Sequence, residues 1–279
     1  MRKAWAVGVG VVLMIALFLV AFPLLVLGAF SHTWRINVSR IYSRIWSRGV
    51  LWACGIKLRI TGQENLGHLP AIYLFNHANQ LDFFVNASYA PRNCLVFGKR
   101  ELARVPFLGW IWLLGGHPMI RRQKLAHGLS VWDDVIEKLR AGTHCTIVAP
   151  EGTRSRHGKL LPFKKGPFVS AIRSGAPLVP VILQGGAERL DKQGNLVPGP
   201  IDVEVLPPVP TQDWSKDTLE EHMDEIRQIY LRYFETHDPE VLRPERVNAQ
   251  TPGAQTPGAE TPGGETPGGQ TAAAETPRG

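Results

Sequence analysis

The sequence predicts an α/β fold, in which a mixed, mostly parallel sheet is flanked by helices and preceded by an N-terminal membrane-anchoring helix segment. Short apolar runs bounded by turn residues alternate with helical patterns across residues 56–235, which is typical of strands joined by helices. A run without any charged residue precedes them, from residue 4 to 30. We therefore expect strands over 56–60, 71–75, 94–98, 117–120, 145–149, 178–183 and 202–206, and helices over 81–89, 109–114, 126–140, 166–174 and 219–235.

The uncharged run is long enough to cross a bilayer, which takes about 20 apolar residues. Its length favours an uncleaved anchor over a cleaved signal peptide, whose apolar part is usually ~7–15 residues long. Pro23 lies inside this run and is a residue type that kinks helices. A re-entrant hairpin that enters only one leaflet is therefore an open alternative to a spanning helix.

The stretch that follows has the pattern of a basic amphipathic helix. Arg40, Arg44 and Arg48 share one helical face. The other face is apolar and consists of Ile41, Tyr42, Ile45, Trp46 and Trp52. Such a helix suits a membrane interface, and the alternative is a surface helix packed on the folded domain. Because arginines after the anchor outnumber the basic residues before it, we expect the domain to face the cytoplasm at the cell inner (cytoplasmic) membrane.

Composition divides the chain into three parts. Residues 1–55 hold the anchor and the basic amphipathic interfacial helix, and residues 56–247 hold the α/β domain. Residues 248–279 repeat Thr-Pro-Gly and contain no large apolar side chain. Because this tail cannot bury a core, we expect it to be disordered.

The net charge of +7 suits anionic lipid surfaces, phosphorylated substrates or nucleic acid. No nucleic-acid motif accompanies the charge, and the long apolar run disfavours a nucleic-acid partner. The three cysteines, Cys54, Cys94 and Cys145, have neither metal-ligand spacing nor the pattern of a disulfide framework. We expect a reducing compartment and no metal.

A histidine and an aspartate, His77 and Asp82, follow the apolar run 71–75. Residues five apart point away from each other on a continuous helix, so the two meet only if the chain turns between them. With Asp82 in the first turn of a helix, it would hold one ring N–H of His77 and leave the other nitrogen as a general base. The nucleophile would then come from the substrate. The alternative is that both residues merely cap a loop and a helix.

A second polar stretch, Glu151-Gly152-Thr153-Arg154, follows the apolar run 145–149 and Pro150. Glycine allows close approach of the backbone to a ligand, and arginine presents a planar fork that matches phosphate oxygens. Lys99 and Arg122 also lie just past predicted strands. Ligands of open α/β sheets gather at such strand ends, so these residues predict an anion site near His77. A basic surface loop is the alternative.

These stretches, taken in order, resemble the four acyltransferase blocks of the bacterial lysophosphatidic acid and glycerophosphate acyltransferases. The matching residues are Asn76-His77 with Asp82, Gly98-Lys99 with Glu101-Leu102 and Pro106, Ile120 with Arg122, Pro150 to Ser155, and Pro177 to Val181. The resemblance covers residues 56–206. Each block alone is weak, but the ordered set is specific.

The resemblance implies transfer of a fatty acyl group from a thioester to the sn-2 hydroxyl of lysophosphatidic acid, giving phosphatidic acid. It implies that His77 is the general base and Asp82 its orienting partner. It further implies that Glu151, Gly152, Thr153 and Arg154, together with Lys99 and Arg122, hold the phosphate. The acyl donor would be acyl-CoA or acyl carrier protein, and no cofactor is expected.

Two departures from the usual blocks concern the acceptor. Arg121 replaces the usual aspartate before the second-block arginine, and Ala149 replaces the usual phenylalanine before Pro-Glu-Gly. Arg121 adds positive charge, which favours a larger or more anionic acceptor. Another lysophospholipid or lysolipid acceptor is therefore an alternative. An inactive membrane-anchored lipid-binding protein is a further one, which the intact His77 and Asp82 disfavour.

Overall fold

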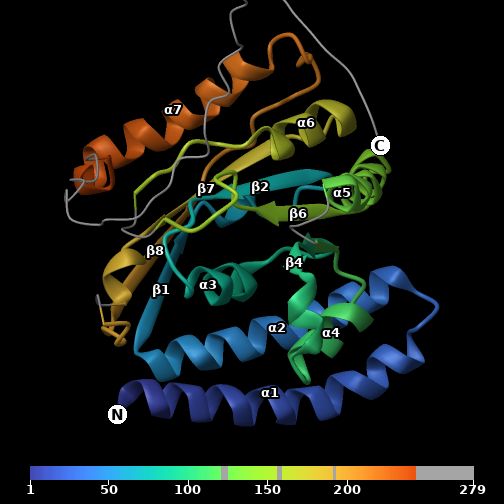
Figure 1. The fold of residues 1–279 in the computed structure, drawn as a ribbon, viewed down its shortest axis with the longest axis vertical. Coiled ribbons are helices and arrows are strands. Elements are labelled where there is room, and N and C mark those ends of the chain that lie inside the picture. Colours follow the sequence, from blue (N-terminus) through green and yellow to red (C-terminus); the bar gives the residue numbers. More distant parts are fainter. Residues whose placement is uncertain (121–124, 156–158, 191–192, 243–279) are drawn as a thin grey trace, which may run out of the picture. The chain divides into compact units, whose positions relative to one another are not determined.

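A computed structural model describes residues 1–120, 125–155, 159–190 and 193–242; the predicted tail, 248–279, lies outside them. Met1–Pro244 form one compact unit around a six-stranded sheet (Figure 1). Its strands, in sequence order, are β1 (Ile56–Thr61), β2 (Ala71–Phe75), β3 (Cys94–Val96), β6 (Cys145–Val148), β7 (Leu178–Gln184) and β8 (Gly199–Val205).

The strands lie in the order β1-β8-β7-β2-β6-β3. β7 and β8 are antiparallel, and every other neighbouring pair is parallel. The prediction of a mixed, mostly parallel sheet is thus confirmed. β2 and β7 lie side by side in the middle of this sheet and are buried along almost their whole length, which explains their continuous apolar sequences.

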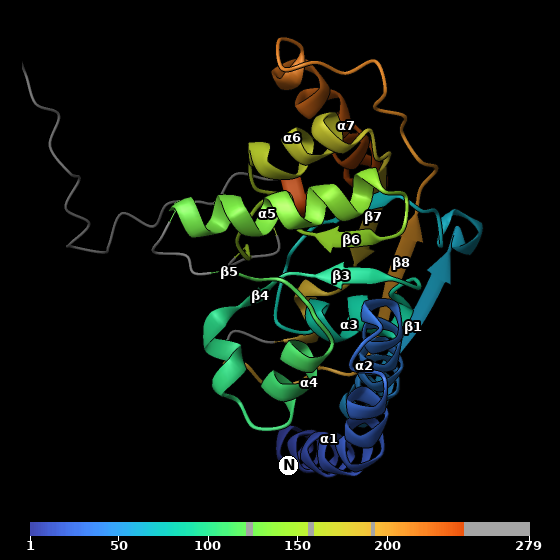
Figure 2. The same ribbon diagram turned by 90° about the vertical axis from the view of Figure 1, so that its right-hand side faces the viewer.

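Helices cover both faces of the sheet, as Figures 1 and 2 show. One face carries α3 (Asp82–Tyr89) and, beyond it, α2 (His32–Cys54); the other carries α5 (Leu125–Arg140), α6 (Lys165–Ser174) and α7 (Leu219–His237). α4 (Leu108–Leu114) lies near α2, and α1 (Arg2–Leu27) packs along the outer side of α2. The five helices predicted between residues 81 and 235 are all present, with ends shifted by at most two residues.

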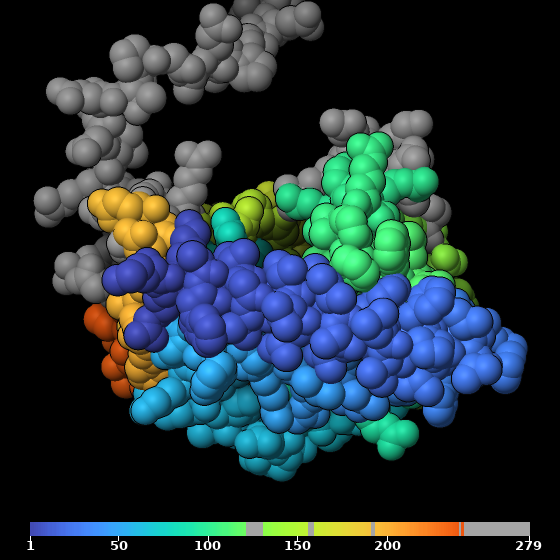
Figure 3. Space-filling view, turned by 90° about the horizontal axis from the view of Figure 1, so that it is seen from below, coloured from blue at the N-terminus to red at the C-terminus, as the bar shows by residue number. Residues whose placement is uncertain are grey.

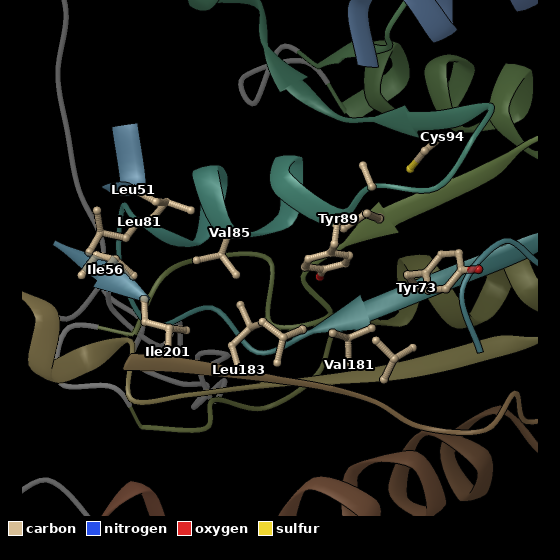
Figure 4. Close-up of a cluster of buried hydrophobic side chains, with 14 of the residues drawn as sticks. Leu51, Ile56, Tyr73, Leu81, Val85, Tyr89, Cys94, Val181, Leu183 and Ile201 are labelled. Atoms are coloured by element: carbon tan, nitrogen blue, oxygen red, sulfur yellow. The ribbon is translucent and has the colours of Figure 1, made fainter. Parts of the chain in front are cut away.

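The core lies on both faces of the sheet. On one face, Val85 and Tyr89 of α3 point toward Val181 and Leu183 of β7 (Figure 4). On the other face, α7 is held to the sheet through Tyr230, which is fully buried and donates its hydroxyl proton to Leu74 O at 2.7 Å. This bond fixes the end of β2 only three residues before His77.

α1 and α2 form an antiparallel hairpin with close helix contact. The Trp46 indole N–H donates to Gly10 O of α1 at 2.7 Å, and the Tyr42 hydroxyl donates to Met14 O at 3.1 Å. A Cβ on Gly49 would come within 2.3 Å of the Leu13 side chain, so the glycine permits this approach. The apolar face predicted for α2 is therefore divided between a part buried under α1 and an exposed part.

The exposed part of the hairpin is strongly apolar. Figure 3 shows α1 extending across one face of the unit beside α2. On α2 the exposed large apolar residues are Trp34, Ile41, Ile45 and Trp52. Of the described helices, α1 alone is long and apolar enough to cross a membrane.

The predicted strand 94–98 is divided between two sheets. β3 ends at Val96, and β4 (Gly98–Lys99) pairs with β5 (Met119–Ile120) in a separate two-stranded sheet. The break follows from packing: Phe97 contacts Trp132 of α5, with ring centroids 4.2 Å apart, and Trp112 lies against Gly98. Lys99 therefore leaves the main sheet and reaches the edge where β2 and β6 end.

Candidate active site

His77 and Asp82 meet across a tight turn at the end of β2. Asp82 is the first residue of α3, as the sequence predicted, and its Oδ2 lies 2.8 Å from His77 Nδ1. The same oxygen accepts the backbone N–H groups of Ala78 and Asn79 at 2.7 and 2.9 Å. The carboxylate thus closes the turn and orients the imidazole with one atom.

The pair has the geometry of a general base with an orienting carboxylate. Asp82 is 1% exposed, whereas the His77 side chain is 23% exposed. Because Nδ1 donates to the carboxylate, Nε2 keeps a lone pair and is the nitrogen that can accept a proton. His77 lines a cavity of about 760 Å³, so this base is accessible to a ligand.

The loop Glu151–Arg154 lies beside the turn and is tied to it through the backbone. Glu151 is 1% exposed, and its Oε1 accepts the His77 backbone N–H at 2.8 Å. Its Oε2 accepts the Leu161 N–H at 3.0 Å, and the Ser155 N–H donates to His77 O at 2.9 Å. Burial raises the pKa of Glu151 to about 7, although the two N–H donors act in the opposite direction.

The carboxylate of Glu151 faces inward, which distinguishes it from its neighbours. Gly152, Thr153 and Arg154 are exposed and line the cavity together with His77. Lys99, the last residue of β4, lines the same cavity. The structure thus brings these predicted site residues together, while Arg122 lies outside the described residues. Gly152 has φ of +69°, a conformation that favours glycine.

The remainder of the cavity is mostly apolar. It continues between α3 and β3 along Phe83, Ala87, Ala90 and Val96 to Trp112, which is itself 6% exposed. Sequence reasoning did not single out Phe83, Ala87, Ala90 or Val96, because their apolar pattern is that of ordinary buried faces. A site with cations beside an imidazole and a long apolar wall can hold an amphipathic molecule with an anionic head.

Comparisons with known proteins agree on one family. The family described as Acyltransferase matches residues 57–184. The 1-acyl-sn-glycerol-3-phosphate acyltransferase of Limnanthes douglasii is 36% identical to this chain, over 71% of the chain and 70% of the relative. The protein of the same name from Salmonella typhimurium is 33% identical, over 65% of the chain and 73% of the relative. The chain belongs to this acyltransferase family.

The fold comparison adds a solved structure of the family. The crystal structure of the 1-acyl-sn-glycerophosphate (LPA) acyltransferase PlsC from Thermotoga maritima matches with a TM-score of 0.62 at 21% identity. The match covers 82% of this chain and 97% of that one. It confirms the fold of this acyltransferase, and the family predicted from the ordered motifs is confirmed by the relatives above.

A second histidine lines the cavity of this acyltransferase but has both ring nitrogens occupied. His117 Nδ1 accepts the Val96 N–H at 3.4 Å, and Nε2 lies 2.9 Å from the Ser39 hydroxyl. Burial lowers the pKa of His117 to about 4, so the ring is neutral at physiological pH. These contacts give His117 a structural part. Within the described ranges, no three His, Cys, Asp or Glu side chains gather as metal ligands.

Proposed function

We propose that this acyltransferase moves a fatty acyl group from an acyl thioester to the sn-2 hydroxyl of lysophosphatidic acid, giving phosphatidic acid. The observation that carries the proposal is the oriented imidazole of His77 in a cavity with Lys99 and Arg154 on its rim and apolar walls beyond. The cations suit a phosphate, the walls suit an acyl chain, and the relatives carry the name of this reaction.

The mechanism needs one proton carrier. Nε2 of His77 takes the proton of the sn-2 hydroxyl while the oxygen attacks the thioester carbonyl. The tetrahedral intermediate then breaks its carbon–sulfur bond, and the departing thiolate takes the proton back from the imidazolium. Asp82 holds the ring and stabilises its charged form, and such general-base assistance contributes about 10²–10⁴-fold.

The phosphate of the acceptor positions the hydroxyl. In this proposal Lys99, Arg154 and Thr153 bind its oxygens, Gly152 lets the backbone approach, and Arg122 belongs to the same set by its place in the motif. Glu151 acts differently from the other members of its motif. Both of its oxygens accept backbone N–H groups of the active-site loops, so it positions His77 and the loop without contacting phosphate.

The hairpin is proposed as the membrane attachment, with the active site at the cytoplasmic side of the inner membrane and acyl-CoA or acyl carrier protein as donor. α2 packs on α3 and β1, and α1 packs on α2 through Trp46. A spanning α1 would have to separate from these partners. We therefore favour the hairpin, residues 1–55, lying in one leaflet with its exposed apolar face toward lipid.

The test uses the purified full chain, a labelled acyl thioester and a panel of lysolipids with and without a bare phosphate. We expect labelled phosphatidic acid from the wild type and none above background from His77→Ala, with unchanged thermal unfolding. Turnover with lysolipids lacking a bare phosphate, but not with lysophosphatidic acid, would reject this acceptor. Equal turnover by His77→Ala would reject the base.

A further inference from the structure

Lys164 precedes α6 and is fixed beside the active-site loop. Its backbone N–H donates to Pro150 O at 2.7 Å, which ties it to the start of the loop Glu151–Arg154. The preceding residue, Phe163, is 8% exposed and packs its ring against Tyr230 and Phe168. The backbone of Lys164 is therefore fixed next to the loop Glu151–Arg154.

The side chain of Lys164 extends over the loop toward the substrate space. A Cβ on Gly152 would lie 3.2 Å from Lys164 Cγ, so the lysine stem passes directly over the glycine. Lys164 lines the cavity together with His77, Lys99 and Arg154. The φ of +69° at Gly152 disfavours a side chain there, and the lysine stem would have to move by a few tenths of an ångström to admit a Cβ.

The next residue points elsewhere. Lys165 forms an ion pair with Glu220 of α7, with Nζ 2.5 Å from Oε1. Both lysines are exposed and adjacent in sequence, yet one lines the cavity and the other is paired outside it. Lys165 therefore serves as a matched control for any effect of general positive charge near the site.

We infer that Lys164 binds the phosphate of the acceptor and makes the site prefer a phosphomonoester over a phosphodiester lysolipid. The inference rests on the proposed function. Lys99, Arg154 and Lys164 come from three separate segments of the chain, and all three line the cavity. A phosphomonoester carries a charge of about −1.5 to −2 at pH 7. A phosphodiester carries only one negative charge, so an additional cation stabilises the monoester more strongly.

Two unreactive ligands separate this binding from catalysis. The first is lysophosphatidic acid without its 2-hydroxyl, and the second is the methyl phosphodiester of the same molecule. Neither can be acylated, so each is a competitive inhibitor whose Ki reports binding alone. The Ki values are measured for the wild type, Lys164→Gln, Lys164→Met and Lys165→Gln in the full chain, alongside KM for the acyl donor.

For Lys164→Gln and Lys164→Met we expect the Ki of the monoester to rise about tenfold, which is about 1.4 kcal/mol. The Ki of the diester should rise about threefold, because its charge is about half as large. The donor KM should stay unchanged, and Lys165→Gln should leave all three constants unchanged. Lys164→Met keeps the apolar stem over Gly152, so agreement between the two Lys164 variants assigns the effect to the charge.

Equal changes for monoester and diester, no change for either, or a rise confined to the donor KM would overturn the inference. The last result would assign Lys164 to the donor. Wild-type turnover of lysophosphatidic acid is measured in the same preparation. Absence of this turnover would reject the proposed function. If turnover is present but the monoester inhibits both Lys164 variants as strongly as the wild type, only the phosphate-binding role of Lys164 is rejected.

Discussion

Glu151 links the two active-site loops through its carboxylate. One carboxylate oxygen accepts an N–H from the His77 turn and the other accepts an N–H from Leu161. Two donors facing two oxygens match the ionised carboxylate, yet burial raises the pKa of this group to about 7. The enzyme thus holds a carboxylate in an environment that opposes its charge, as is common at functional sites.

The raised pKa predicts how stability changes with pH. In the unfolded chain the Glu151 carboxyl has its ordinary pKa of 4.5, and in the folded chain its pKa is about 7. Its contribution to stability is therefore fully present below about pH 4.5 and is lost as pH rises through 7. Relative to Glu151→Gln, which does not titrate, the wild type should lose about 3 kcal/mol of unfolding free energy between pH 4.5 and 8.

Denaturant unfolding of both proteins in the same detergent at a series of pH values measures this difference. Other titrating groups are shared by the two proteins and cancel in the comparison. A difference in unfolding free energy that stays constant across this range would contradict the raised pKa.

At this scale the sequence predicted the local pair and missed the distant support. His77 and Asp82 lie five residues apart, so a single turn decides whether they meet, and its polar residues were visible in the sequence. Glu151 meets His77 through backbone N–H, which carries no sequence signal, across a separation of 74 residues. Lys164 and Lys165 are identical neighbours whose different surroundings depend on the position of α7.

At the scale of elements, periodicity predicted the strands and helices but not their partners. The split of 94–98 into β3 and β4 depends on Trp112 and Trp132, which lie in other helices. On α2, periodicity assigned Tyr42 and Trp46 to a lipid-facing side. The structure instead buries both under α1. Because α2 has apolar residues on two sides, one side packs on α1 while the other stays exposed.

The hairpin yields a prediction with a control on the same helix. Trp46 is 7% exposed, donates to Gly10 O and packs against Phe84, whereas Trp52 is 70% exposed. Trp46→Ala should lower the unfolding free energy in detergent by about 3–5 kcal/mol, because it leaves a cavity and removes the indole hydrogen bond to α1. Trp52→Ala should change it by about 0.5 kcal/mol or less.

Thermal and denaturant unfolding of the two variants provide the measurement. A similar loss in both would mean that α1 does not pack on α2 as described. Retained membrane binding by Trp46→Ala is compatible with this prediction, since the exposed apolar face remains.

At the scale of the whole molecule, the cavity is built from one continuous part of the chain. The described residues that line the cavity fall between Arg40 and Pro167, and all belong to the compact unit Met1–Pro244. The division into residues 1–55, 56–247 and 248–279 is a proposal from composition. The α/β fold could be predicted from the sequence because fold class depends on the alternation of strands and helices, which is visible in the hydrophobic pattern.

The tail offers a direct test of that division. A chain ending at Val247 should keep kcat and KM for both substrates within about twofold in membranes, because the Thr-Pro-Gly repeats lack side chains that bury a core. The measurement compares truncated and full chains at equal membrane content. A large loss of activity would assign the tail a part in the reaction or in donor binding.

The hydroxyl of Tyr230 bonded to Leu74 has a consequence for biosynthesis. A ribosome translates the proposed membrane hairpin first, and Tyr230, which secures the strand before the catalytic turn, follows its partner Leu74 by 156 residues. The nascent polypeptide can therefore reach its bilayer well before it can react, and enzymatic competence waits for the final helix.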